Sequence, residues 1–311
     1  MKRWRAVLGM RSPLARPLTA GRLFGHVCWG LALREGPEAV GEFLARMAGD
    51  NPPLVLGEPA PVNFVAMPVL LRDGRIAPDV AGKRLNLWNL YRRAGLMPRT
   101  ALLKAAEGLT ATGVREALDA SGWPRPMRAR RGVRVRSAAN RLSAAPSGRN
   151  DWLAVENWGE ADGGHMEVVI VSDSEPAEIE RLLRMGLEHG VGRAASVGYG
   201  QVELISVDPL DWPEVGGADA LVTLGPCVPK RGDPAGGAWQ VQTHWGRLGG
   251  TFATEGIAVE KRPVIGLKAG AVLTGSVEGK AFVGRLVSGV HPAKPEVVHY
   301  GLAPVVAVKC Q

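Results

Sequence analysis

The stretch Gly190–Gly200, which reads GVGRAASVGYG, is the strongest local signal in this chain. Its glycines allow backbone amides to approach a ligand closely, and amides of this kind bind phosphate oxygens. We predict a helix after Ser174 and a strand over Val202–Val207, so the loop lies between a helix and a strand. The P-loop and the dinucleotide-binding fingerprint need the opposite order, a strand followed by a helix. The stretch therefore excludes both nucleotide-binding folds, and the alternative to an anion-binding loop is a plain flexible connection.

The segments before this loop predict the fold class. Apolar spacing and turn residues indicate a first strand over Trp4–Met10, a helix over Ala20–Arg34, an interrupted strand over Pro52–Pro61 and a strand over Met166–Val171. With the helix and strand around the loop, the order becomes strand, helix, strand, insertion, strand, helix, strand. This order is ferredoxin-like, an α+β arrangement that also underlies the common RNA-recognition module (RRM).

Two segments lie outside this pattern. Residues 62–150 are irregular, apart from a helix that we predict over Ala101–Leu118, and we interpret them as an insertion. Prolines mark a boundary after residue 208, and residues 218–311 are rich in glycine and β-branched residues. The sequence therefore predicts an N-terminal domain over residues 1–208 and a mostly β domain over residues 209–311. The strands predicted in the second domain are Leu221–Leu224, Trp239–Thr243, Val264–Leu267, Val272–Thr274 and Val305–Val308.

The predicted helix over Ala20–Arg34 has two different sides. One side is apolar and suits a core. The other side is mixed, and a further layer of structure can cover it. This mixed side carries Arg22, His26, Trp29 and Leu33.

Positive charge is concentrated in two windows. The formal net charge is +8, yet residues 1–34 hold seven basic and no acidic side chains, and residues 120–150 hold eight basic and no acidic ones. The rest of the chain is therefore net acidic. Segregation of this kind favours a nucleic-acid partner. The alternative is a high arginine content that reflects genomic base composition.

No residue pattern predicts chemistry. The three cysteines form no CxxC pair and the histidines lack metal-ligand spacing, so we expect no metal and no cofactor. No apolar segment is long enough to span a bilayer, and we interpret the protein as cytoplasmic. His26 is the obvious candidate for a general acid or base. We favour a packed or hydrogen-bonded histidine, because no second group has a clear partner role.

Two segments are candidates for direct contact with a polyanion. In the glycine-rich loop, Arg193 offers a planar positive fork, and Tyr199 can stack on a base or simply pack. In the second basic window, Asn140 and Arg141 can contact a base edge and a phosphate. The alternative for that window is a solvated run of charge.

Four stretches, in chain order, resemble a known family. They are residues 11–29 (RSPLARPLTAGRLFGHVCW), residues 140–143 (NRLS), residues 198–204 (GYGQVEL), and residues 263–270 (PVIGLKAG) together with 297–302 (VVHYGL). This set resembles the RAMP superfamily of CRISPR proteins, and within it the fourth-subunit family of the type III-A Csm complex, in the Cas-five group. Ala144 departs from the family glycine at that position, and Ala194 and Ala195 make the loop less polar than in many relatives.

The resemblance implies two ferredoxin-like domains face to face, the second one degenerate, with an inserted thumb-like element. It also implies antiviral defence, capture of the 5′ handle of the guide RNA (crRNA), and contact with a large polymerase-like subunit and a backbone RAMP subunit. It implies no catalysis. The expected RNA-binding residues are Arg22, His26, Asn140, Arg141, Gly190, Gly192, Arg193, Ser196, Gly198, Tyr199 and Gly200.

Three alternatives stay open at this point. The first is a Cas-six-like, metal-independent endoribonuclease in which His26 takes part. The second is a scaffold that touches only proteins. The third is the equivalent subunit of a type III-B or III-D complex.

Overall fold

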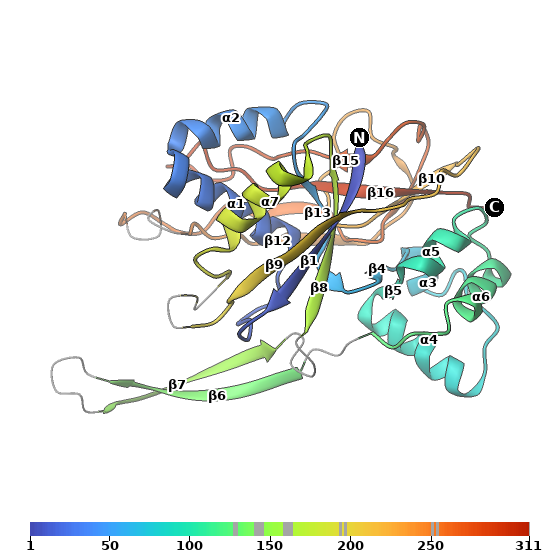
Figure 1. The fold of residues 1–311 in the computed structure, drawn as a ribbon, viewed down its shortest axis with the longest axis horizontal. Helices are drawn as coiled ribbons and strands as arrows, with labels where there is room; N and C mark the ends of the chain where they lie inside the picture. Colours follow the sequence, from blue (N-terminus) through green and yellow to red (C-terminus); the bar gives the residue numbers. More distant parts are fainter. Residues whose placement is uncertain are drawn as a thin grey trace.

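The computed structural model describes residues 1–126, 130–139, 146–157, 164–192, 195, 198–249, 252 and 255–310, with residues 130–139 and 146–157 described by their backbone. The fold mixes helices and sheets, as an α+β protein does (Figure 1). An antiparallel sheet in the N-terminal half has the strand order β2-β8-β1-β9, and a further short strand, β3, also pairs with β8. Its strands are β1 (Lys2–Met10), β2 (Val55–Leu56), β3 (Ala60–Pro61), β8 (His165–Ser172) and β9 (Val202–Pro209).

The order of elements predicted for the N-terminal half is confirmed. Helix α1 (Ala20–Glu35) follows β1, and helix α7 (Pro176–Leu187) connects β8 to β9. The predicted interrupted strand appears as β2 and β3, which both pair with β8 on either side of a short break. Helix α2 (Pro37–Met47) packs beside α1. That the two halves form two ferredoxin-like domains stays a prediction.

Helices α1 and α7 cross at two glycines that bring their backbones together. A Cβ atom on Gly30 would lie 2.4 Å from the carbonyl oxygen of Met185, and one on Gly186 would lie 2.8 Å from the backbone nitrogen of Val27. These distances are shorter than any real Cβ contact, so both positions require glycine. The close crossing presses the apolar side of α1 onto the sheet, where Leu23 is fully buried.

We expect Gly30→Ala to destabilise the fold by about 1–3 kcal/mol, because the added methyl group forces the two helices apart. Gly25→Ala is the matched control, since Gly25 lies in the same helix and a Cβ there meets nothing within 4 Å. We expect that control to be stabilising by about 0.5–1 kcal/mol, because alanine is the better helix former. Urea denaturation of both variants measures the difference. Equal stabilities would show that the helices do not cross at Gly30.

The elements between β3 and β8 lie off the N-terminal sheet. A helical group gathers near the C-terminus of the chain, and an extended hairpin of two strands projects from the body (Figure 1). The hairpin consists of β6 (Arg130–Ala139) and β7 (Pro146–Asn157), which among the described strands pair only with each other. The off-sheet elements therefore continue to Asn157, past the predicted end of the insertion at residue 150. The helical group consists of β4 (Phe64–Ala66), α3 (Val69–Arg72), α4 (Gly82–Ala94), β5 (Leu96–Pro98), α5 (Arg99–Ala105) and α6 (Ala111–Ala120).

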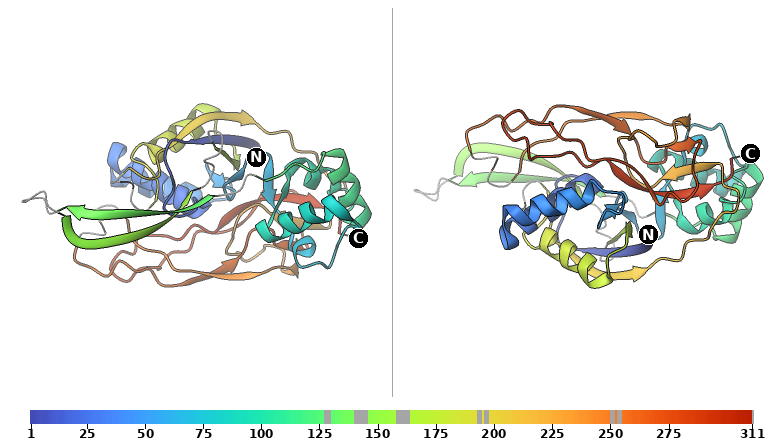
Figure 2. Two further views of the ribbon diagram at one scale, coloured as in Figure 1. Left: turned by 90° about the horizontal axis from the view of Figure 1, so that it is seen from below. Right: turned by 90° about the horizontal axis from the view of Figure 1, so that it is seen from above.

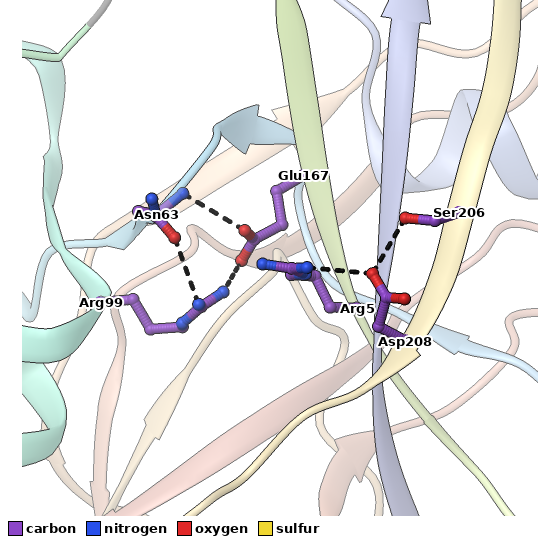
Figure 3. Close-up of polar contacts among 6 residues, drawn as sticks. All are labelled: Arg5, Asn63, Arg99, Glu167, Ser206 and Asp208. Atoms are coloured by element: carbon purple, nitrogen blue, oxygen red, sulfur yellow. Dashed lines mark hydrogen bonds and ion pairs between the residues drawn. The ribbon is translucent and has the colours of Figure 1, made fainter.

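A buried ion pair fastens the helical group to the N-terminal sheet. Arg99, the first residue of α5, donates to the carboxylate of Glu167 on β8, and Arg99 also donates to the side-chain oxygen of Asn63 at 3.3 Å (Figure 3). Glu167 accepts a second hydrogen bond from the backbone nitrogen of Asn63 at 3.2 Å. Arg99 is 8% exposed and Glu167 is 1% exposed, so both charges depend on these partners.

The C-terminal half is built from strands. One antiparallel sheet has the order β11-β14-β10-β16-β15, and β12 and β13 form a separate two-stranded ribbon. In the described part of this half, no α-helix follows α7. The strands predicted from sequence are found, two of them with the predicted bounds. The strands are β10 (Ala220–Thr223), β11 (Gly236–Ala238), β12 (Val241–His244), β13 (Val264–Leu267), β14 (Val272–Thr274), β15 (Phe282–Gly284) and β16 (Leu302–Val308).

The two halves lie against each other (Figure 2) and meet at α1. Tyr300, from the C-terminal half, places its ring 4.7 Å from that of Phe24. Its hydroxyl accepts a hydrogen bond from the backbone nitrogen of Leu56 at 2.6 Å and donates to the Leu56 carbonyl at 3.1 Å. On the mixed side of α1, Trp29 contacts Phe252 with ring centroids 5.4 Å apart. The C-terminal half therefore provides the further layer that the sequence of α1 predicted.

Candidate nucleic-acid interface

Helix α1 and the glycine-rich loop are joined by a hydrogen bond from the loop to His26. The backbone nitrogen of Gly192 donates to Nε2 of His26 at 2.8 Å. Burial, and to a smaller degree the positive charge of Arg22, lowers the pKa of His26. Both the acceptor role of Nε2 and the lowered pKa favour the neutral imidazole. The structure therefore brings together two of the residues that the sequence predicted for the site.

The base of the glycine-rich loop is fixed by backbone hydrogen bonds. Val191 donates to the carbonyl of Gly200 at 2.8 Å, and Gly200 donates to the carbonyl of Pro13 at 2.8 Å. Gln201 donates to the hydroxyl of Ser12 at 2.8 Å. A Cβ on Gly200 would lie 2.0 Å from the carbonyl oxygen of Val191, and φ of Gly200 is +67°. Only glycine fits there, and the loop is held to the segment that leads into α1.

The amides of the four loop glycines are engaged inside the protein. Gly190 donates to the carbonyl of Leu187 at 3.0 Å and Gly198 donates to that of Ala195 at 3.1 Å, while Gly192 and Gly200 bond as described above. These four amides are therefore not free to bind phosphates, because each already has an acceptor, and the prediction that amides of this loop hold phosphates now concerns its other residues, of which 193, 194, 196 and 197 lie outside the described part of the chain. Gly190 and Gly200 instead allow the two ends of the loop to lie close together, and Gly192 and Gly198 leave the loop backbone without side chains.

Two loop glycines leave room for a ligand. A Cβ on Gly192 or Gly198 would meet nothing within 4 Å. A polyanion can therefore approach the loop backbone closely at these positions.

The remaining predicted site residues fall into two groups. Tyr199 is 2% exposed, so its ring packs inside the protein and this conformation offers no ring face to a base. Of the two alternatives that the sequence left open for Tyr199, stacking on a base or packing, this burial supports packing. Asn140, Arg141, Arg193 and Ser196 lie outside the described residues.

Arg22 lies between the loop and a cavity. Its backbone nitrogen donates to the hydroxyl of Thr19, the N-cap of α1, at 3.3 Å, and its guanidinium donates to the carbonyl of Pro17. Burial lowers the pKa of Arg22, as does the neighbouring Arg16, while Glu58 opposes that shift. The charge of Arg22 in turn acts to lower the pKa of His26, which lies on the loop side. It acts in the same direction on the pKa of Glu58 and of His244, which both line the cavity.

The cavity lies where the two halves meet and has a volume of about 350 Å³. Residues that could contact an anion or a nucleotide come from distant parts of the chain, and sequence analysis did not select them. One sequence signal for the cavity did exist, because residues 263–270 and 297–302, which carry part of the family resemblance, supply part of the lining. The polar and charged lining residues are Thr19, Glu58, Arg72, Gln242, His244, Lys268, His299 and Tyr300.

Glu58 is the acidic residue in the lining of this cavity, and its side chain is half-buried. It accepts a hydrogen bond at 3.1 Å from the backbone nitrogen of Ala20, in the first turn of α1. Burial raises the pKa of Glu58 to about 7, although the Ala20 amide and the charge of Arg22 act in the opposite direction. Near neutral pH a large fraction of Glu58 is therefore protonated, which makes the cavity less negative and better suited to a polyanion.

Two cavity histidines lie in contact, with the ring centroids of His244 and His299 4.8 Å apart. Burial lowers the pKa of His299 to about 4, and the charges of His244 and Lys261 add to the shift. The unfolded chain has an ordinary histidine pKa of about 6.5 and so binds more protons than the folded protein between these values. The free energy of unfolding must therefore fall, through this residue, as the pH decreases from about 6.5 to about 4.

We expect His299→Asn to lose less stability than the unmodified protein between pH 7 and pH 4. Glu58 contributes in the opposite direction, because its raised pKa stabilises the fold at low pH and that contribution is lost as the pH rises to about 7. Because both proteins contain Glu58, the difference between their pH dependences of stability gives the contribution of His299. Urea denaturation at a series of pH values measures it, and parallel pH curves would contradict the assignment.

The face of the N-terminal sheet that is turned away from α1 and α7 has a different character from an RNA-stacking platform. On this face the central strands carry charged and aliphatic residues in place of aromatic ones. Arg5 on β1 donates to the carboxylate of Asp208 on β9 at 2.9 Å, and Ser206 donates to the same oxygen at 2.9 Å (Figure 3). Part of the face is covered by the helical group through Arg99 and Glu167. The geometry therefore favours the loop and the cavity as the interface.

Among the described residues, no group of three or more histidine, cysteine, aspartate or glutamate side chains could hold a metal ion. In the same part of the chain, no helix is both long and apolar enough to cross a membrane.

Comparisons with known proteins give matches at the level of structure. No family model matches the sequence, and no curated protein sequence matches it. The chain is similar to one in the crystal structure of a Csm1–Csm4 cassette in complex with cA4, with a TM-score of 0.59, 14% identity and 99% of each chain covered. A second match, in a Csm1–Csm4 cassette in complex with AMPPNP, has a TM-score of 0.56 and 17% identity, again with 99% of each chain covered.

A third match points to the same component. It comes from the crystal structure of the Csm3–Csm4 subcomplex in the type III-A CRISPR-Cas interference complex, with a TM-score of 0.51 and 12% identity. The alignment covers 99% of this chain and 100% of that one. Csm4 is the component common to these structures. At such identities the likeness shows that the chain shares this fold over its whole length.

Proposed function

We propose that this chain is the subunit of a type III CRISPR effector complex that binds the 5′ handle of the guide RNA, without cutting it. The observation that carries the proposal is the meeting of α1, the glycine-rich loop and the cavity around Arg22. The likeness to chains of Csm1–Csm4 and Csm3–Csm4 structures supports the CRISPR setting. The fold would then comprise two ferredoxin-like domains, the second one degenerate.

The RNA path in this proposal follows positive charge and open backbone. The handle phosphates pass the open glycines Gly192 and Gly198 and reach Arg22, and one nucleotide enters the cavity. Lys268 and Arg72 line that cavity and add positive charge. The hairpin of β6 and β7 serves as the thumb-like element, because its two strands hold five of the arginines of the second basic window and extend away from the body.

The partners in this proposal are a large subunit and a backbone RAMP subunit of the same complex. The matched structures contain Csm1 or Csm3 beside Csm4, which supports one partner of each kind.

The absence of catalysis is part of the proposal. Nε2 of His26 accepts from the Gly192 amide, so this nitrogen is not available to take a proton from a ribose hydroxyl, and the lowered pKa of His26 disfavours the protonated imidazole that a general acid needs. The endoribonuclease alternative can be tested directly. Incubation with repeat RNA and a chelator should leave the RNA intact, whereas specific cleavage that His26→Ala abolishes would establish the enzyme.

Photo-crosslinking tests the position of the RNA. Handle RNA with a photoreactive nucleotide at each position should crosslink to residues 190–200 and to the cavity lining. Crosslinks confined to the face of the N-terminal sheet that is turned away from α1 and α7, or none at all with a folded protein, would overturn the site.

A further inference from the structure

The ribbon of β12 and β13 carries an exposed apolar surface that the proposed RNA site does not use. In the described part of the chain, seven large apolar side chains are exposed, and four of them lie on or beside this ribbon. We call this surface the ribbon face. Its members, with their exposed fractions, are Trp239 (40%), Val241 (56%), Trp245 (71%) and Ile265 (67%).

The ribbon has two faces with different roles. In the antiparallel register Thr243 lies opposite Ile265, and Gln242 lies opposite Gly266. Gln242, Gly266 and His244 line the cavity. Because neighbouring residues of a strand point to opposite sides, the ribbon face is turned away from the cavity.

The composition of the ribbon face indicates the chemistry of its partner. Residues 239–245 and 264–267 include no charged side chain. A nucleic-acid surface needs cations for the phosphates, whereas the centre of a protein interface is poor in charge and rich in tryptophan. Valine and isoleucine at the middle of the face also offer no ring on which a base could stack. The ribbon face therefore suits a protein better than RNA.

The edge of β12 indicates the shape of that partner. Among the described residues, β12 pairs with β13 and with no other strand, and residues 241–244 make no backbone hydrogen bond outside that ladder. Edge strands that must stay free are usually protected by a charge, a proline or a bulge. The stretch from Trp239 to Trp245, WQVQTHW, has no charged residue and no proline. Its backbone is therefore open to a further strand.

We propose that an extended segment of a partner subunit adds to the free edge of β12 and places alternate, uncharged apolar side chains on the ribbon face. This mode supplies main-chain hydrogen bonds from the edge and side-chain contacts from the face. The inference rests on the proposed membership of a multi-subunit complex, but it does not depend on where RNA binds.

The test compares two exposed apolar positions in the full chain, co-expressed with its guide RNA, the large subunit and the backbone RAMP subunit. Ile265→Asp places a charge at the middle of the ribbon face, and Leu85→Asp does the same at an exposed position of α4. We expect Ile265→Asp to weaken capture of one subunit by at least about tenfold, because a desolvated charge is costly at an interface centre. Leu85→Asp should capture both subunits normally, and both variants should keep the affinity for handle RNA.

Hydrogen exchange supplies the second readout. The outward amides of residues 241–244 should exchange quickly in the free protein and slowly in the assembled complex. Normal capture of both subunits by Ile265→Asp, or unchanged exchange of β12 on assembly, would overturn the docking site. Crosslinking of handle RNA to Trp245 would also overturn it, by making RNA the occupant. A protein that captures its subunit through β12 but binds no handle RNA would instead refute the proposed function alone.

Discussion

Arg99→Ala is expected to lower the free energy of unfolding by about 3–5 kcal/mol, because it leaves the carboxylate of Glu167 buried without its partner. Glu167 is 1% exposed, and its remaining hydrogen bond comes from the backbone of Asn63. Thermal and urea denaturation measure the loss. Because Arg99 belongs to α5 and Glu167 to β8, we also expect the helical group to become easier to cleave by protease.

Two control variants separate this effect from a general loss of charge. Arg34→Ala removes an exposed partner of Glu188 and should change stability little. The double variant Arg99→Leu, Glu167→Leu removes both buried charges and should recover most of the stability. If Arg99→Ala were no more harmful than Arg34→Ala, the helical group would not depend on this ion pair.

Gly200→Ala is expected to have the largest effect on the glycine-rich loop. The residue has φ of +67°, which costs a residue with a side chain about 1–3 kcal/mol, and its Cβ would overlap the carbonyl of Val191. Relief of that overlap must break the hydrogen bonds from Val191 to Gly200 and from Gly200 to Pro13. The loop then loses its fixed position beside His26.

We expect Gly200→Ala to weaken binding of handle RNA by about tenfold or more, which corresponds to at least about 1.4 kcal/mol. Gly216→Ala is the control, because a Cβ there meets nothing within 4 Å and its φ is not in the left-handed region. Fluorescence anisotropy with labelled RNA measures both affinities. Equal affinities in two folded proteins would show that the shape of the loop does not matter for RNA.

Local pattern predicted much of the fold. Strand β13 and helix α1 follow from alternation and from helical spacing with a capping threonine, and both are found close to the predicted bounds. The predicted helix over Ala101–Leu118 is wrong, since the structure has α5 and α6 with a break between them. Thr110 begins a new helix as the N-cap of α6, where its hydroxyl accepts from the backbone nitrogen of Gly113 at 3.1 Å, and a tertiary contact also lies at the break. The backbone nitrogen of Leu109 donates to the carbonyl of Lys309, near the C-terminus, at 2.9 Å.

The site was predicted only in part, because much of it depends on long-range packing. The mixed side of α1 identified Arg22 and His26, and the glycine spacing identified the loop. Neither pattern shows that the glycine amides have acceptors inside the protein, or that Tyr199 is buried. The cavity was missed, because Glu58 and His299 are brought together only when the C-terminal half packs on α1.

The affinity of handle RNA for Arg22→Ala, set against Arg46→Ala, tests the central claim most directly. Arg22 lies where the loop meets the cavity, whereas Arg46 is exposed on α2. Loss of one charge-assisted contact predicts a decrease of about 10- to 100-fold for Arg22→Ala at moderate salt. Arg46→Ala should bind as the unmodified protein does. Equal affinities for the two variants, or no binding of handle RNA by the folded, unmodified protein, would contradict the proposed function.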